Sequence, residues 1–323
     1  MGSYILRRLL LAFPLLLAVT IVCFAILHLT PGDPVTFLYG TDATPAELAR
    51  ARAMWGLDDP IHIQYLKWLW NFMHGNLGRS YVDGRPVLDI IMERVPATLT
   101  LTLTAFVLAL VVGVGLGVLS AMRSLSLVDY LANLLATTLY STPSFWLALL
   151  LIMLFAVQLK WLPSSGMISV DGPSSLGDRL AHLVLPAFVL AFREIGRLIR
   201  FTRASMLDVL RQDYLRTAVA KGLPASRMIL RHAFPNALIP IITVVGLTLP
   251  TLLAGSIVVE SVFSWPGMGM LAWDAAKARN YGILMGDIVL VGALVIIGNL
   301  IADVAYSVAD PRIRYGKGEA SAA

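Results

Sequence analysis

Long apolar runs constrain this chain more than any other feature of its sequence. The first run, Leu9–Leu29, can cross the hydrocarbon core of a bilayer, which takes about 20 residues of helix. It is longer than the apolar part of a secretory signal peptide, which has roughly 7–15 residues. Of the 323 residues, 58% are hydrophobic and 14% are charged, whereas soluble domains carry about 25% charged residues. The sequence therefore predicts an all-α polytopic membrane protein.

Four further apolar runs predict transmembrane helices, namely Ala97–Ala121, Leu127–Val157, Leu238–Phe263 and Ile283–Val308. Another candidate, Leu180–Phe201, is cleanly apolar only over 182–192. A helix of about 11 residues rises only ~17 Å, so this candidate must continue through charged residues to cross a core of about 30 Å. With it, the sequence predicts six transmembrane helices.

The distribution of basic residues predicts the orientation of these helices, because short loops rich in Lys and Arg usually face the cytoplasm. The stretch 201–236 is rich in Arg and holds only two acidic residues, and Arg7 and Arg8 precede the first run. We expect both termini and 201–236 to be cytoplasmic. The chain then divides into an N-terminal helix (1–29), an extracytoplasmic excursion (30–96), a five-helix core that includes 201–236 (97–308) and a cytoplasmic tail (309–323).

The excursion after the first helix is not a featureless loop in sequence. Trp55, Tyr65, Trp68 and Trp70 alternate with apolar residues at helical spacing. Because Trp and Tyr favour the membrane–water interface, the pattern predicts a small folded segment lying on the membrane surface.

A basic stretch, "DYLRTAVAKGLPASRMILRHAFPNAL" (213–238), separates the fourth and fifth predicted helices. Upstream of it, 205–208 has the form of a capping box and predicts a helix start, and one apolar stripe then recurs at helical spacing. Gly222 suits the end of this helix, Pro224 suits the first turn of a second one, and Pro235 would close that second helix. The residues alone leave two readings: a segment lying on anionic lipid, or a helix pair whose small-residue corner another protein can approach.

The pattern Arg216-Thr217-Ala218, then Gly222, then His232-Ala233-Phe234-Pro235 resembles the EAA signature of the permease subunits of ABC importers. The usual Glu, Ala, Ile and Leu of that signature are replaced at 216, 217, 232 and 234. The chain is similar in particular to the dipeptide, oligopeptide and nickel permease family. The other segments that carry this resemblance are "RRLLLAFPLLLAVTIVCFAILHLTPGDPV" (7–35), "GNLGRSY" (75–81), "ESVFSWPGMG" (260–269) and "ADPRIRYG" (309–316).

This resemblance implies a type I ABC importer permease fold in which 201–236 forms cytoplasmic coupling helices. The residues that it implies for docking on partner ATPase subunits are Arg216, Thr217, Ala218, Lys221, Gly222, Leu223, His232 and Pro235. It also implies a second homologous permease subunit, two ATPase subunits and an extracytoplasmic solute-binding protein, in a bacterial or archaeal plasma membrane. Dipeptides, oligopeptides, glutathione and nickel chelates all remain open as substrates.

The sequence lacks the motifs of the competing functional classes. It has no G-x-x-x-x-G-K-[ST] phosphate loop, so we expect ATP on the partner subunits and no cofactor or metal on this chain. Its histidines are scattered and its one cysteine, Cys23, has no Cys partner. A membrane-embedded enzyme would need a nucleophile or metal cluster, and a stand-alone carrier often has an internal repeat. We see neither pattern, and these classes stay as alternatives.

Charged residues inside predicted spans are candidates for function. Arg193 and Glu194 in the fourth helix, and Glu260 near the outer end of the fifth, would give a translocation path a polar lining. Alternatively, Glu194 pairs with Arg197 one turn along, while the arginines extend to the cytoplasmic interface. We favour this local pairing. Close helix packing is expected at Gly113, Gly115 and Gly117.

Overall fold

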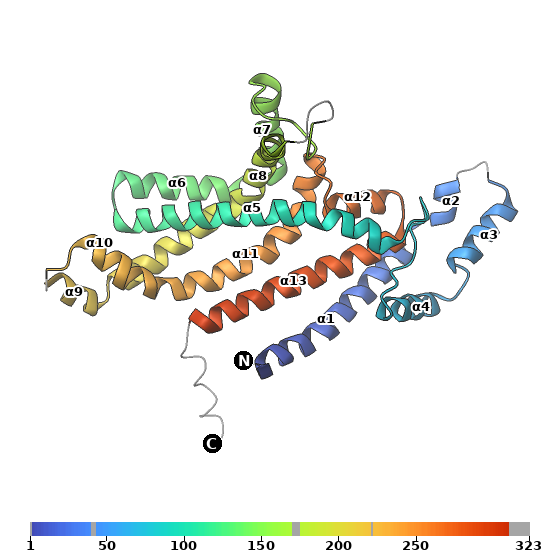
Figure 1. Ribbon diagram of the computed structural model, residues 1–323, viewed down its shortest axis with the longest axis horizontal. Coiled ribbons are helices and arrows are strands. Elements are labelled where there is room, and N and C mark those ends of the chain that lie inside the picture. The colour runs from blue at the N-terminus through green and yellow to red at the C-terminus, as the bar shows by residue number, and fades with distance from the viewer. Residues whose placement is uncertain (1, 40–42, 170–174, 221, 310–323) are drawn as a thin grey trace, which may run out of the picture. The chain divides into compact units, whose positions relative to one another are not determined.

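The computed structural model describes residues 2–39, 43–169, 175–220 and 222–309, and these residues form helices without a strand (Figure 1). The chain divides into two units, Met1–Leu99 with Ser264–Leu294 and Thr100–Phe263 with Val295–Ala323. Two long helices, α5 (Val87–Met122) and α13 (Tyr281–Ala309), contribute residues to both units. The predicted all-α class is confirmed. Most of the predicted tail, 310–323, lies outside the described residues.

The first unit contains α1 (Gly2–Leu29), α2 (Pro34–Tyr39), α3 (Pro45–Trp55), α4 (Ile61–Met73), the start of α5, α12 (Met268–Lys277) and the start of α13. The Thr44 side chain caps α3 by accepting the backbone N–H of Glu47, and the Glu47 carboxylate accepts the backbone N–H of Thr44. The helical spacing of the aromatic residues in 30–96 is therefore real, because they lie on α3 and α4.

The aromatic residues of this unit surround a cavity of about 690 Å³. Trp55 stacks on Tyr81, with ring centroids 4.4 Å apart and planes at 12°. Burial, and secondarily the neighbouring Tyr281, raises the pKa of Tyr81 to about 12. These contacts make the excursion a packed part of the unit.

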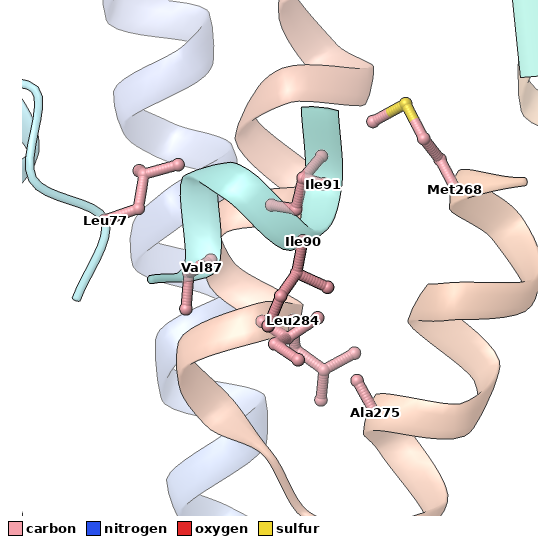
Figure 2. Close-up of a cluster of buried hydrophobic side chains, with 8 residues drawn as sticks. Leu77, Val87, Ile90, Ile91, Met268, Ala275 and Leu284 are labelled. Atoms are coloured by element: carbon pink, nitrogen blue, oxygen red, sulfur yellow. The ribbon is translucent and has the colours of Figure 1, made fainter. Parts of the chain in front are cut away.

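The core of the first unit joins segments that are far apart in the sequence (Figure 2). Val87 and Ile91, one turn apart at the start of α5, and Met268 of α12 are fully buried, and they share a cluster with the buried Leu284 of α13. Burial of this apolar face stabilises the first turns of α5, and the helix therefore begins at Val87. The helix therefore starts well before the predicted span over Ala97–Ala121, inside the segment assigned to the excursion.

The second unit is built around α8 (Leu176–Leu210), which packs against α6 (Leu127–Ser141), α7 (Ser144–Leu151) and α11 (Phe234–Val262). The π-helical η1 (Ile152–Gln158) follows α7 directly. Between α8 and α11 lie α9 (Asp213–Ala220), α10 (Ala225–Met228) and the π-helical η2 (Ile229–Ala233). The predicted helix over Leu180–Phe201 thus exists but is longer at both ends.

Two glycines of α5 allow it to approach α8 closely. A Cβ at Gly113 would lie 2.7 Å from the Cβ of Leu198, and one at Gly117 would lie 2.6 Å from the Cβ of Thr202. A Cβ at Gly115 would meet no atom within 4 Å. The prediction of close packing is therefore confirmed at the first two positions and wrong at Gly115, which lies on a different face of the helix.

A buried carboxylate ties the turn between α5 and α6 to α8. Asp129 accepts hydrogen bonds from Arg203 of α8 at 2.6 and 2.8 Å and from the Ser120 hydroxyl of α5 at 2.5 Å. It also accepts the backbone N–H of Leu125 and the side-chain amide of Asn133. Such a charge is tolerated in a protein interior because it is paired and its lone pairs are used.

The described helices that could cross a membrane do not all coincide with the predicted transmembrane helices. Three are long and apolar enough to cross a membrane on their own, Leu10–Leu29, Val87–Met122 and Tyr281–Ala302, and two bent pairs would raise the total to five. The prediction of one helix over Leu127–Val157 is wrong, since α6 and α7 meet at 103°. The break follows from Pro143, because the residue before a proline is driven out of the helical region and Thr142 is extended (φ −81°, ψ 126°).

Alanine substitutions at the three glycines of α5 should separate packing from helix propensity. We expect Gly113→Ala and Gly117→Ala each to destabilise the protein by about 1–3 kcal/mol, because the added methyl group overpacks the contact with α8. Gly115→Ala is the matched control and should be neutral or slightly stabilising. Thermal unfolding in detergent micelles measures the difference; equal transition temperatures for the three variants would contradict the close contact.

Candidate functional site

The connection between α8 and α11 is the candidate site, and it starts later than the sequence suggests. The predicted capping box at 205–208 is wrong, because Ser205 and Met206 are buried within α8. Burial of this face extends α8 to Leu210, so tertiary packing overrides the local capping signal. The helix direction changes at Gln212, whose N–H donates to the Val209 carbonyl at 3.0 Å.

The corner of this connection has the predicted form. The helix α9 ends at Ala220, and Gly222 has φ +77°, the left-handed conformation that glycine adopts without strain. The carbonyl of Pro224 then accepts the N–H groups of Arg227 and Met228 at 3.0 Å and starts α10. The two short helices with a glycine between them are therefore confirmed. A Cβ at Gly222 would meet no atom within 4 Å, so the corner stands free of the rest of the described chain.

The predicted end of the second helix at Pro235 is wrong. The π-helical turn η2 joins α10 to α11 without an interruption, and α11 begins at Phe234. Pro235 lies in the first turn of α11, where its missing N–H removes no helical hydrogen bond that the turn needs. The proline that was expected to stop a helix therefore lies within one continuous helical segment, just after the π-helical turn.

The corner is exposed, but its two flanks are anchored. Leu215 of α9 and Ile229 of η2 are buried in one cluster with Met206 of α8, Ala121 of α5 and Ala233 of η2. Sequence reasoning missed Leu215 and Ile229 as anchors, because the apolar stripe predicted after 205–208 was continued across the break between α8 and α9. Each of them is an apolar residue next to polar ones in the sequence, and this pattern could have indicated that they are buried.

Polar contacts close the base of the connection. The side-chain amide of Asn236 donates to the Tyr214 hydroxyl at 3.0 Å and to the His232 carbonyl at 2.7 Å. These bonds link α9 to the start of α11, so the spacing of the two flanks is held by hydrogen bonds as well as by apolar packing. The sequence reasoning did not identify this pair either.

The predicted docking residues that the structure describes are spread over the connection, with Gly222 and Leu223 at the corner and His232 and Pro235 at its base. Thr217, Gly222 and Pro235 are exposed, and Leu223 and His232 are half-buried. The Thr217 hydroxyl donates to the Asp213 carbonyl within α9. Lys221 lies outside the described residues, and so do the side chains of Arg216 and Ala218.

The predicted pathway residues have separate environments. Glu194 is buried and contacts Arg197 at 2.6 Å, which confirms the expected local pair, and Arg197 also donates to the Thr248 hydroxyl of α11 at 2.9 Å. Glu260 is fully buried in α11. Arg193 is exposed and lies over the ring of Tyr140. A role of these residues in a pathway stays a prediction.

Comparisons with known proteins place this arrangement in a family. Residues 113–315 match the model described as "Binding-protein-dependent transport system inner membrane component", and residues 1–102 match the corresponding N-terminal model. The chain belongs to this family of inner-membrane transport components. Within the described residues no group of three His, Cys, Asp or Glu side chains could hold a metal ion.

Full-length relatives of this permease carry transport names. The oligopeptide transport system permease protein AppB of Bacillus subtilis is 44% identical, with 98% of this chain and 100% of the relative covered. The dipeptide transport system permease protein DppB of Escherichia coli K12 is 41% identical, with the same coverage. A solved chain of the MetNI methionine ABC transporter has a similar fold, at 18% identity, a TM-score of 0.57, and coverage of 69% of this permease and 97% of that chain.

The family assignment decides between the classes left open by the sequence. This permease is a membrane component of a binding-protein-dependent transport system and not an enzyme. The predicted resemblance to ABC importer permeases is confirmed, and the fold of the type I importer permeases is shared.

Leu215→Ala should loosen the corner without unfolding the permease. The substitution removes a buried side chain from the only described apolar anchor on α9, and large-to-small changes of this kind cost about 2–5 kcal/mol locally. We expect limited trypsin digestion of the detergent-purified chain at Arg227 and Arg231 to be severalfold faster. Thr217→Ala, an exposed position on the same helix, is the control and should be cleaved like the wild type. Equal rates for both variants would show that Leu215 does not hold the corner.

Proposed function

We propose that this permease forms the membrane path for peptide uptake in a bacterial or archaeal ABC importer, with the connection 211–236 as its contact to the ATPase subunits. The observation that carries the coupling role is the corner at Gly222, which is exposed while its flanks are buried through Leu215 and Ile229. Peptides are favoured as the substrate because two relatives at 41–44% identity over their full length are named for oligopeptide and dipeptide transport.

In this proposal, other protein chains form the remaining subunits of the importer. A second homologous permease subunit would complete the path, two ATPase subunits would bind ATP, and an extracytoplasmic binding protein would deliver the peptide. This chain has no phosphate loop and is proposed to hold no cofactor of its own. Closure of the ATPase subunits would move the anchored corner as a rigid knob, and the permease helices would then alternate between inward- and outward-open arrangements.

The proposed topology has six spans with both termini in the cytoplasm. It counts α1, α5, the bent pair α6 and α7, α8, α11 and α13. The charged helix α8 is the sixth span, supported by a length of 35 residues, which gives an α-helix a rise of about 50 Å. The proposal puts residues 30–86 outside the cell and the connection 211–236 inside.

Cysteine labelling tests this topology. In a Cys23→Ala background, a cysteine at Thr217 should be labelled by a membrane-impermeant maleimide only after the cells are opened, whereas a cysteine at Met54 should be labelled in intact cells. Both positions are exposed in the structure, so access depends on the side of the membrane. Labelling of the Thr217→Cys variant from outside would overturn the orientation.

Two substitutions at Gly222 test the docking role. Gly222→Val places a β-branched residue at φ +77°, which costs about 1–2 kcal/mol, and adds bulk to the corner. Gly222→Asn is the matched control for bulk, because asparagine tolerates the left-handed conformation. We expect Gly222→Val to insert normally, to lose at least tenfold in peptide-stimulated ATP hydrolysis and to copurify poorly with the ATPase. Gly222→Asn should keep the backbone and lose less.

The assay uses the complete importer in proteoliposomes, at matched amounts of permease, with a panel of di- to pentapeptides. A permease that copurifies with no ATPase, or that takes up none of these peptides, would refute the proposed function. Wild-type ATP hydrolysis and copurification for Gly222→Val would refute the docking role alone and would favour a segment that lies on lipid.

A further inference from the structure

The four arginines on the inner half of α8 are not equivalent. Arg197 contacts Glu194 at 2.6 Å, and Arg203 contacts Asp129 at 2.6 Å. Within the described residues no carboxylate forms an ion pair with Arg193 or Arg200, and both side chains are exposed. The charged stretch thus splits into two arginines that form ion pairs and two that form none, although the Glu194 carboxylate also attracts Arg193.

The two arginines without an ion pair, Arg193 and Arg200, meet at one aromatic ring. Their guanidinium carbons lie 5.0 Å (Arg193) and 4.5 Å (Arg200) from the centroid of the Tyr140 ring on α6. They leave α8 two turns apart, about 10 Å along the axis, so both side chains must lean toward the same ring to reach it. Tyr140 is 38% exposed, which leaves the ring and the two cations accessible together.

A close helix contact fixes this arrangement. A Cβ at Gly196, between the two arginines on α8, would lie 2.6 Å from the Ala136 carbonyl oxygen and 3.1 Å from the backbone nitrogen of Tyr140. The absence of a side chain at Gly196 therefore lets α6 approach until Tyr140 stands beside α8. The position of the ring between the arginines results from backbone packing and not from the arginines alone.

Two positive charges close to one exposed ring favour the binding of an anion between them and the solvent. The attraction of a guanidinium to an aromatic face offsets part of the repulsion, but it does not neutralise either charge. In a membrane helix such charges face a water-filled path or a partner, and a guanidinium binds carboxylate or phosphate oxygens through paired N–H groups. The Tyr140 hydroxyl adds a further hydrogen-bond donor at the same place.

We propose that Arg193, Arg200 and Tyr140 form a binding site for the C-terminal carboxylate of the transported peptide. This inference rests on the proposed peptide substrate. The carboxylate is the one anionic group that every linear peptide shares whatever its side chains, so a fixed pair of guanidiniums can hold peptides of different sequence. The site gives the path a contact that does not depend on the residues of the cargo.

The test compares a peptide acid with its amide in the complete importer. Uptake of labelled trialanine and of trialanine amide is measured in proteoliposomes for the wild type, Arg193→Gln, Arg200→Gln and the control Arg179→Gln. Arg179 is an exposed arginine near the start of the same helix, outside the proposed site. Binding of both labelled compounds to the purified permease–ATPase complex without the binding protein is measured in parallel, so that selection by the binding protein does not enter.

We expect each site variant to lower uptake and binding of trialanine by about tenfold, to leave trialanine amide unchanged, and thus to remove the preference of the wild type for the acid. Arg179→Gln should keep that preference. An unchanged acid-to-amide ratio in the site variants would overturn the inference. Loss of copurified anionic phospholipid with an unchanged ratio would also overturn it, and would assign the arginines to a lipid phosphate. Failure of the wild type to take up any peptide would instead refute the proposed function.

Discussion

The ion pair between Arg203 and Asp129 is the interaction on which the part of the second unit beside the connection 211–236 depends. It fixes α8 to the first turn of α6, with the Asp129 carboxylate buried and the Arg203 side chain 26% exposed. Removing Arg203 would leave the Asp129 charge buried without its partner, and a change of this kind costs about 3–5 kcal/mol. The glycine contacts of α5 and α6 with α8 lie within two or three turns of this pair. Together they make α8 a fixed element from which the connection 211–236 projects.

This arrangement explains how one segment is both exposed and well positioned. A Cβ at Gly222 would meet no described atom within 4 Å, yet Leu215 and Ile229 place the flanks of the corner against helices that the ion pair holds. A docking element needs this combination, because an exposed corner without anchors would lose conformational entropy on binding. The hydrogen bonds of Asn236 with Tyr214 and His232 act in the same direction.

Features that depend on residues close together in the sequence were predictable. The long apolar runs predicted the helical class, Gly222 between two helical patterns predicted the corner, and the spacing of Glu194 and Arg197 predicted their contact. Some errors are local, such as the missed break at Pro143 and the helix expected to end at Pro235, but others involve contacts between distant segments. Ser205 has the local form of a helix cap but is buried in α8, and Val87 starts α5 because its partners come from α12 and α13. Tyr140 could not be placed beside two arginines without knowing that Gly196 lets the helices meet.

The break at Thr142 and Pro143 has a mechanical consequence. Helical hydrogen bonds make a helix stiff along its axis, and those of α6 end at the bond from the Thr142 N–H to the Thr138 carbonyl. Pro143 has no N–H with which to continue the series. An axial displacement of α6, applied through Asp129 or Tyr140, therefore reaches α7 only through the backbone torsions at the break. Strain generated at the end of the unit beside the connection 211–236 can be absorbed there, and α7 can keep its place while α6 moves.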